Sequence, residues 1–308
     1  MKFSLLLLRR LLILSKLCLC WLMGPRPAPN LNPVPGLPPG NTHRSIPKTS
    51  RTAPLNRQTY FTTSRDTAIE PSGPIAGRLD LLQRIHLIIV APVEYLFQSD
   101  SCSLFGANSD ADSLEAVARE HLHLASLTVL KTEDAHTEKI LRLFRQTRAG
   151  PGEWVWVVFL THGILEQGRL MVAAYESTPA LMSSFLKVED ILEALAETSF
   201  CLTLDICFAE GALPAWNEAV RVHPDLNGMV IGSAGINQVA LDQNSFCRHL
   251  TRVLCGGGAA RLQTSSDMHT VFELTKREFN FGGMMFIDET GQVPFLESNG
   301  FNPVVSRR

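Results

Sequence analysis

Apolar residues along the chain fall into short continuous runs, separated by stretches in which they recur at helical spacing. Five runs have the length and composition of a buried strand, at 85–90, 127–130, 154–160, 200–204 and 229–233. The helical spacing predicts a helix capped by Asp110 or Asp112, and others at 133–148, 186–196, 245–254 and 270–279. Parallel strands need crossover connections, so this alternation predicts an α/β fold with a mostly parallel central sheet.

The rest of the C-terminal two-thirds is predicted to connect these elements. Residues 168–173 can form a small hairpin arm, and 212–227 are predicted to be a loop. The C-terminal end, with Pro294 and Pro303, is predicted to be coil with room for one short strand.

The N-terminal part has a different composition. The first 65 residues hold ten Lys or Arg and no acid, which leaves 18 basic residues against 30 acidic ones in the remainder. A domain with this acidic excess is a poor candidate for nucleic acid, because phosphate backbones are bound through Lys and Arg. We expect an apolar leader at 1–24, a Pro-rich, basic, disordered linker at 25–79 and the folded domain at 80–308.

The leader admits three interpretations. Arg9, Arg10 and Lys16 divide its apolar stretch into runs shorter than a membrane-spanning helix. A secretory signal is favoured, an organellar presequence comes second and an uncleaved membrane anchor third. Contact with a membrane is expected only through this leader.

Seven cysteines are present, and their spacing matches no metal site. Cys18 and Cys20 belong to the leader, so a processed chain would keep an odd number of thiols and no evident disulfide framework. We predict no metal and no cofactor, and we expect Cys201 and Cys247, which sit inside apolar elements, to be core residues.

Two of the apolar runs deliver chemically reactive side chains. The run 154–160 is followed by His162, and the run 200–204 is followed by Cys207. Side chains just past the carboxyl ends of neighbouring parallel strands meet in one crevice, so these two can form a pair in which the imidazole takes the thiol proton. A lone Cys after a strand is more often structural, and the conjunction of both residues is what favours catalysis. His223, in the predicted loop, is the reserve candidate for the base.

The pair predicts acyl transfer, with Cys207 as nucleophile and His162 as the group that protonates the leaving amine. Gly163 has no side chain, so its backbone N–H could approach a substrate carbonyl. Together with the N–H of Cys207 it is the candidate oxyanion hole.

From Ile85 to Gly211 the sequence resembles the catalytic core of the caspase and metacaspase superfamily of cysteine peptidases, to which legumain-type enzymes are also related. The matching pieces are the first strand, the Asn-Asp-Ala-like segment 106–111, Gly150-Pro151-Gly152 before the second matching strand, the His162-Gly163 pair and the strand that ends before Cys207. Further on, the segments 231–242 and 291–294 resemble the small-subunit strand with its loop and the terminal Pro-containing stretch. The 45 residues between His162 and Cys207 approach the spacing of about 50 expected for caspases.

The resemblance implies a three-layer sandwich, a Cys-His dyad and polypeptide substrates. Asp205, two residues before Cys207, resembles the metacaspase acid that selects Lys or Arg before the scissile bond, and Asp242 resembles a substrate-binding position of the following loop. The likeness is incomplete. Gly211 is farther along the chain from Cys207 than the equivalent Gly is from the catalytic Cys in caspases or in metacaspases. Asp205 could instead be a turn residue that caps the next helix.

Three functional hypotheses therefore stay open. The first is a cysteine endopeptidase that cleaves after Lys or Arg. The second is a catalytically silent interaction module, or pseudoprotease, with the same fold. The third is a phosphate-binding or phospho-acceptor domain using Asp205, although Ala91-Pro92-Val93-Glu94 after the first strand is not a Gly-rich phosphate loop. The oligomeric state is not predicted.

Overall fold

The computed structural model describes residues 83–96, 104–178, 181–236, 238, 240, 245–257, 265–283 and 293–308. The predicted leader, the linker and Asp242 lie outside these residues.

A six-stranded sheet forms the centre of the domain, in the order β10-β8-β7-β3-β1-β2. Its members are β1 (Arg84–Ala91), β2 (Leu124–Lys131), β3 (Glu153–Leu160), β7 (Phe200–Asp205), β8 (Gly228–Gly232) and β10 (Phe295–Ser298). The first five run parallel, and β10 joins β8 in antiparallel orientation at one edge. The predicted α/β fold with a mostly parallel sheet is confirmed.

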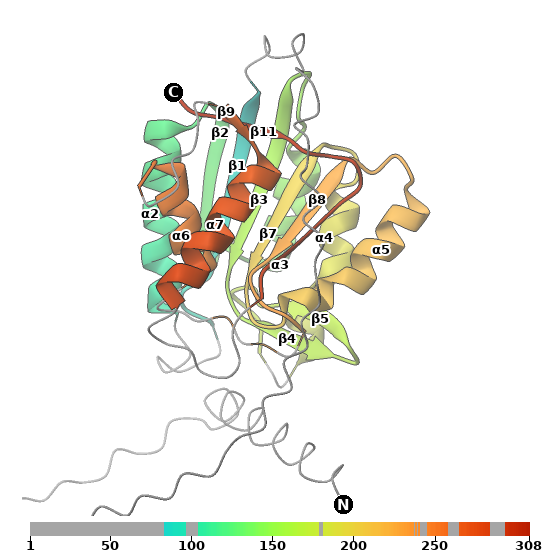
Figure 1. Ribbon diagram of the computed structural model, residues 1–308. Coiled ribbons are helices and arrows are strands. Elements are labelled where there is room, and N and C mark those ends of the chain that lie inside the picture. Colours follow the sequence, from blue (N-terminus) through green and yellow to red (C-terminus); the bar gives the residue numbers. More distant parts are fainter. Residues whose placement is uncertain are drawn as a thin grey trace, which may run out of the picture. The chain divides into compact units, whose positions relative to one another are not determined.

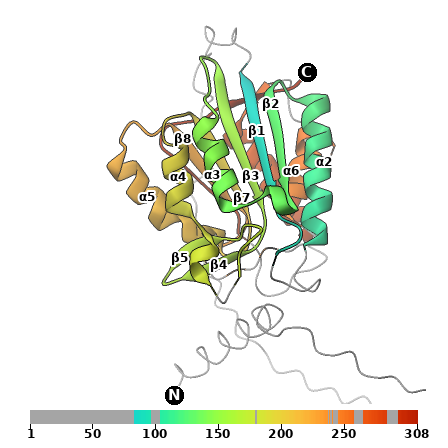
Figure 2. The same ribbon diagram turned by 180° about the vertical axis from the view of Figure 1, so that it is seen from behind.

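Helices cover both faces of this sheet. One face carries α2 (Phe105–His121), α6 (Phe246–Leu254) and α7 (Met268–Gly283), as Figure 1 shows. The other carries α3 (Thr137–Gln146), α4 (Val188–Leu195) and α5 (Leu213–Val222), which come to the front in Figure 2. The predicted three-layer sandwich is therefore confirmed.

Alternating side chains of the strands fill two separate cores. In β1, Ile88 and Val90 pack toward α3 and α4, whereas Leu87 and Ile89 pack toward α2 and α6. All four are at most 1% exposed. A strand buried on both faces needs a continuous apolar run, which is why the pattern of the sequence located these strands.

A small antiparallel sheet follows β3. It consists of β4 (Gly163–Glu166), β5 (Arg169–Val172) and β6 (Leu186–Lys187). Gln167 and Gly168 form the two-residue turn between β4 and β5, and both have positive φ, as tight hairpins require. The predicted hairpin arm exists and begins earlier in the chain than expected.

Three local predictions were wrong. Helix α2 starts at Phe105, so Asp110 lies inside the helix, where it is 2% exposed, and does not cap it. The predicted loop 212–227 contains α5, whose Pro214 stands in the first turn, where proline is tolerated. The C-terminal end supplies two strands, β10 and β11 (Val304–Ser306), of which β11 pairs with β9 (Ser265–Asp267).

Candidate functional site

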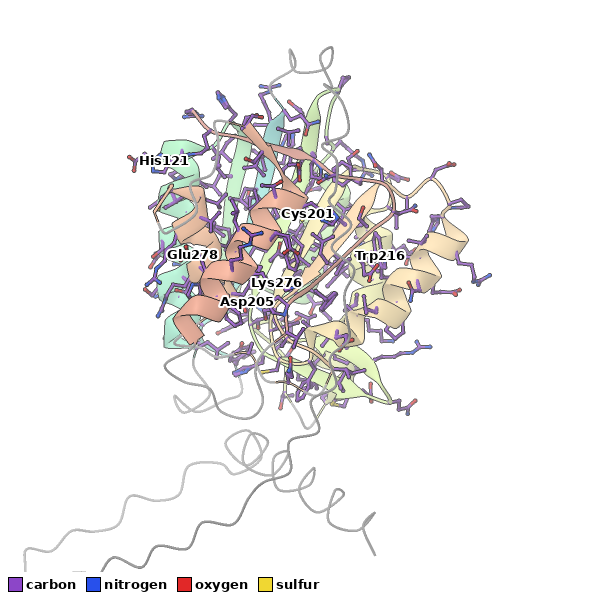
Figure 3. The ribbon with its side chains drawn as sticks, viewed as in Figure 1. His121, Cys201, Asp205, Trp216, Lys276 and Glu278 are labelled. Atoms are coloured by element: carbon purple, nitrogen blue, oxygen red, sulfur yellow. The ribbon has the colours of Figure 1, made fainter. Side chains whose placement is uncertain are left out.

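The carboxyl ends of β3 and β7 bring the predicted dyad to one place. These strands are neighbours in the sheet, and Leu160 on β3 pairs with Asp205 on β7. His162 and Cys207 each follow two residues beyond that pair, so the two chain segments leave the sheet side by side. Figure 3 shows Asp205 at the end of β7 from which this turn starts.

Gly163 and Cys207 are in direct backbone contact. A Cβ atom added to Gly163 would lie 2.3 Å from the carbonyl oxygen of Cys207, a distance that real Cβ atoms do not reach. Glycine is thus required at this position by the approach of the Cys207 backbone. The contact involves the carbonyl of Cys207, and the oxyanion hole built from the N–H groups of Gly163 and Cys207 stays a prediction.

Tyr95 positions the segment that carries His162. Its ring lies against the imidazole of His162, with 5.3 Å between the ring centroids and an interplanar angle of 34°. Its hydroxyl lies 2.9 Å from Oγ1 of Thr161, which donates to the carbonyl of Ala173 at 2.9 Å. Since Thr161 uses its proton on Ala173, the hydroxyl of Tyr95 is the donor to Thr161.

Nothing in the periodicity of the sequence identified Tyr95. It lies in the irregular segment after β1, the strand next to β3, and this position past a strand end is the signal that could have found it. The ring would limit the orientations available to the imidazole.

Cys207 stands at the start of a tight turn. Phe208, the next residue, has φ 60°, a left-handed conformation that non-glycine residues rarely adopt. Its N–H donates to the carbonyl of Gln238 at 2.9 Å, and Gly211 closes the turn by donating to the carbonyl of Phe208 at 2.8 Å. Hydrogen bonds of both the N–H and the carbonyl of Phe208 therefore fix this turn, and the strained backbone conformation of Phe208 is adjacent to the proposed nucleophile.

The thiol of Cys207 is not activated in this conformation. Its pKa is raised to about 11, mainly by burial and also by the negative charge of Asp205, although a backbone hydrogen bond from Ala240 acts in the opposite direction. Cys207 is nevertheless partly exposed, whereas Cys201 and Cys247 are fully buried. Burial also raises the pKa of Cys201, to about 12. The assignment of these two residues to the core is confirmed.

Asp205 is buried, at 6% exposure, and faces the amino end of α6. Its Oδ2 accepts the backbone N–H of Cys247 at 2.7 Å, whereas its buried Oδ1 has no hydrogen-bond partner among the described residues. Burial raises the pKa of Asp205 to about 6, and the charge of Asp110 contributes in the same direction. Asp205 thus does meet a helix amino terminus, but that of α6 and not of the helix that follows it in sequence.

A second buried carboxylate, Asp110, accompanies Asp205. It comes from α2 and receives Arg248 Nε at 3.1 Å together with the hydroxyl of Ser245. Ser245 also caps α6, since its Oγ accepts the N–H of Arg248 at 3.0 Å. Two carboxylates therefore share the amino end of one helix with the single guanidinium of Arg248. The sequence had suggested Asp110 as a helix cap and as part of a family likeness, and neither suggestion predicted this pairing.

The remaining candidates are not part of this site. His223 is exposed at the C-terminal end of α5, from which the chain returns to the amino end of β8. As α5 runs antiparallel to the strands, His223 lies at the opposite end of the sheet, and its proposed role as a reserve base was wrong. Asp242 belongs to the residues that the structure does not describe.

The described residues were also searched for a metal site and for a membrane-spanning helix. Within them, His, Cys, Asp and Glu side chains do not gather into a group that could hold a metal ion. None of the helices in this part of the chain combines the length and the hydropathy of a membrane-spanning segment.

Fold and site together define an α/β domain that carries a His and a Cys at the carboxyl ends of adjacent parallel strands. No protein-family model and no curated protein matches the chain. Among solved structures it is similar to caspase-1 from Spodoptera frugiperda, with 16% identity, a TM-score of 0.47 and coverage of 73% of this chain and 92% of the other. The Drosophila initiator caspase Dronc gives 13% identity, a TM-score of 0.47 and coverage of 73% and 82%.

A protein from Geobacter sulfurreducens is also similar, with 12% identity, a TM-score of 0.46 and coverage of 71% and 93%. At such TM-scores and identities, the likeness says nothing about activity.

Proposed function

We propose that the protein is a cysteine endopeptidase that uses Cys207 as nucleophile and His162 as acid and base. The contact between Gly163 and the Cys207 carbonyl carries this proposal, because it fixes the His162 segment against the Cys207 turn. The pairing of Leu160 on β3 with Asp205 on β7 also supports it, because His162 and Cys207 each follow two residues after this pair.

The chemistry follows from the properties of the two side chains. His162 takes the proton of the Cys207 thiol as Sγ attacks the carbonyl carbon of a peptide bond. The oxyanion then accepts hydrogen bonds from the backbone N–H groups of Gly163 and Cys207. His162 returns the proton to the leaving amine, and water hydrolyses the acyl-enzyme.

Asp205 and Asp110 support a preference for Lys or Arg before the scissile bond. They lie near the nucleophile turn, where Arg248 pairs with Asp110 and the backbone N–H of Cys247 donates to Asp205. The buried Oδ1 of Asp205 has no hydrogen-bond partner among the described residues, so a substrate cation that reached it would find an acceptor, whereas an acidic side chain would be repelled. Asp242 is proposed to contribute from the loop outside the described residues.

A direct test measures cleavage of fluorogenic peptides that end in Arg, Lys or Asp by the full-length chain. We expect cleavage after Arg and Lys, no cleavage after Asp, and complete loss of activity in Cys207→Ala. Cys255→Ala is the matched control, since Cys255 is also a partly exposed free thiol but lies at the end of α6. Activity that survives Cys207→Ala, or disappears equally in Cys255→Ala, would refute the assigned nucleophile.

One observation favours a second function, the silent interaction module. The thiol of Cys207 has its pKa raised to about 11, far from the thiolate that catalysis needs. Iodoacetamide alkylation separates the two. An endopeptidase should show alkylation of Cys207 that depends on His162, whereas a silent module should show the slow reaction of an ordinary buried thiol and no cleavage of any peptide.

A further inference from the structure

The amino end of the sheet holds a hydrogen-bonded chain of three side chains that the proposed dyad does not use. Ser126 on β2, His86 on β1 and Glu153 on β3 form it. Ser126 Oγ lies 2.8 Å from His86 Nδ1, and His86 Nε2 lies 2.9 Å from Glu153 Oε2. Serine, imidazole and carboxylate in this order are the parts of an activated serine nucleophile.

An irregularity of the sheet creates this alignment. Ile85 pairs with Leu124, but the next residue, His86, pairs with Ser126, so the register shifts by one residue at this point. Without the shift His86 would stand opposite Ala125, which has no polar atom in its side chain. Such irregularities re-aim side chains and are frequent beside active sites.

The surroundings of Glu153 determine which imidazole nitrogen carries the proton. Glu153 is paired with Arg84 and accepts the N–H of Gly150 at 3.0 Å through Oε2. The hydrogen bond with His86, the N–H of Gly150 and the charge of Arg84 lower its pKa, so the carboxylate is ionised and can only accept. In the neutral imidazole the proton therefore lies on Nε2, and Nδ1 is left to accept the hydroxyl proton of Ser126.

Ser126 is accessible from solvent. It is exposed on β2, the edge strand of the sheet, whereas the side chains of His86 and Glu153 are 16% and 13% exposed. In Figure 2, β3 separates β1 and β2 from α3, and no described helix lies in front of the amino ends of β1 and β2. Ser126 is therefore accessible to a substrate in solution, and its base, His86, is more buried.

We propose that Ser126 is a second nucleophile of this protein, which takes an acyl group from activated acyl donors with His86 as its general base and Glu153 as the residue that orients the imidazole. In the step, Ser126 Oγ forms a bond to the carbonyl carbon of the donor and its proton moves to His86 Nδ1. The bond from that carbon to the leaving oxygen or sulfur breaks, and the leaving group departs with the electron pair. The product is an O-acyl ester of Ser126.

This site is separate from the Cys207 site. Glu153 is the first residue of β3, and His162 lies just beyond the other end of the strand. The nine residues from Glu153 to His162 correspond to about 30 Å of extended chain. The two sites can therefore be tested independently in the same molecule.

The test uses the full-length protein and p-nitrophenyl acetate at pH 8, with the acetylated residues located by peptide mass spectrometry. Ser113 provides an internal control, since it is exposed on α2 and its hydroxyl donates to the backbone carbonyl of Ser109 at 2.8 Å instead of to an imidazole. We expect acetylation of Ser126 to be at least about a hundredfold faster than that of Ser113, the lower range of general base catalysis. Equal rates at the two serines would overturn the proposal, and no variant has to fold for this comparison.

Two variants distinguish activation from a structural role. His86→Gln keeps hydrogen-bonding groups between Ser126 and Glu153 but removes the base, and it should bring the Ser126 rate down to that of Ser113. Glu153→Gln should lower the Ser126 rate less, because the imidazole remains but loses its orienting charge. If Ser126 reacts equally fast in wild type and His86→Gln, the three side chains are only a link between strands.

Discussion

Replacement of Asp205 by Asn removes a charge that is costly to bury. The carboxylate is 6% exposed, accepts one backbone N–H from Cys247 and lies near the charge of Asp110. An amide oxygen can keep the bond to Cys247, and an amide remains neutral at every pH of interest. The substitution therefore isolates the electrostatic cost of Asp205 with little change in its volume.

The magnitude follows from the pKa of Asp205, which burial raises from 3.8 to about 6. One pKa unit corresponds to about 1.4 kcal/mol, so ionised Asp205 costs the folded state about 3 kcal/mol. The folded state holds the proton more tightly than the unfolded state does. The free energy of unfolding should therefore fall as the pH rises from about 4 to about 6, and the loss should persist above pH 6.

Urea unfolding of the full-length chain at several pH values between 4 and 8 tests this expectation. The Asp205→Asn protein should unfold at higher urea concentration than wild type above pH 6 and should lack the decline between pH 4 and 6. Asp225→Asn, at an exposed carboxylate beyond α5, is the control and should follow the wild-type curve. A wild-type curve without the decline, or Asp205→Asn less stable than wild type at pH 7, would refute the reasoning.

Three further substitutions address the geometry of the site. Gly163→Ala should lower the free energy of unfolding by about 1–3 kcal/mol and abolish peptide cleavage, because its Cβ would overlap the carbonyl oxygen of Cys207; full activity in a folded variant would contradict the contact. Tyr95→Phe should cost about 1 kcal/mol in urea unfolding, since the ring is kept and the hydrogen bond to Thr161 is lost, and an unchanged stability would argue against that bond. Phe208→Gly should be more stable than Phe208→Ala by about 1 kcal/mol, because φ at this position is 60°; the reverse order would show that the left-handed turn is absent.

The sheet could be predicted from the sequence because each of its central strands is buried on both faces. Such strands need unbroken apolar runs, as in β1 and β3, and these runs were recognised. Helix α5 was missed, since residues 212–227 were predicted to be a loop; its Pro214 stands in the first turn, where a proline is compatible with a helix. The edge strand β10 is short and only partly buried, so its pattern carries little signal.

The candidate site could be predicted only where its residues follow strand ends. His162 and Cys207 do so, and the register of β3 with β7 then brings their segments together. Asp110, Arg248 and Tyr95 come from other elements, and their approach depends on how helices and loops pack on the sheet. Periodicity along the chain contains no information about such contacts, which is why Arg248 and Tyr95 were missed and Asp110 was predicted only as a helix cap and as part of a family likeness.

The same buried charge links the two functions that the protein could have. Burial is the main cause of the raised pKa of Cys207, and the charge of ionised Asp205 adds to it, so the group proposed to select a cationic substrate also helps to keep the nucleophile in its thiol form. A Lys or Arg side chain bound at Asp205 would offset that charge and lower the pKa of Cys207, so binding of the correct substrate would itself favour the thiolate. In Asp205→Asn, Cys207 should accordingly be alkylated at lower pH than in wild type. A silent module would have no such substrate, and its Cys207 would stay protonated.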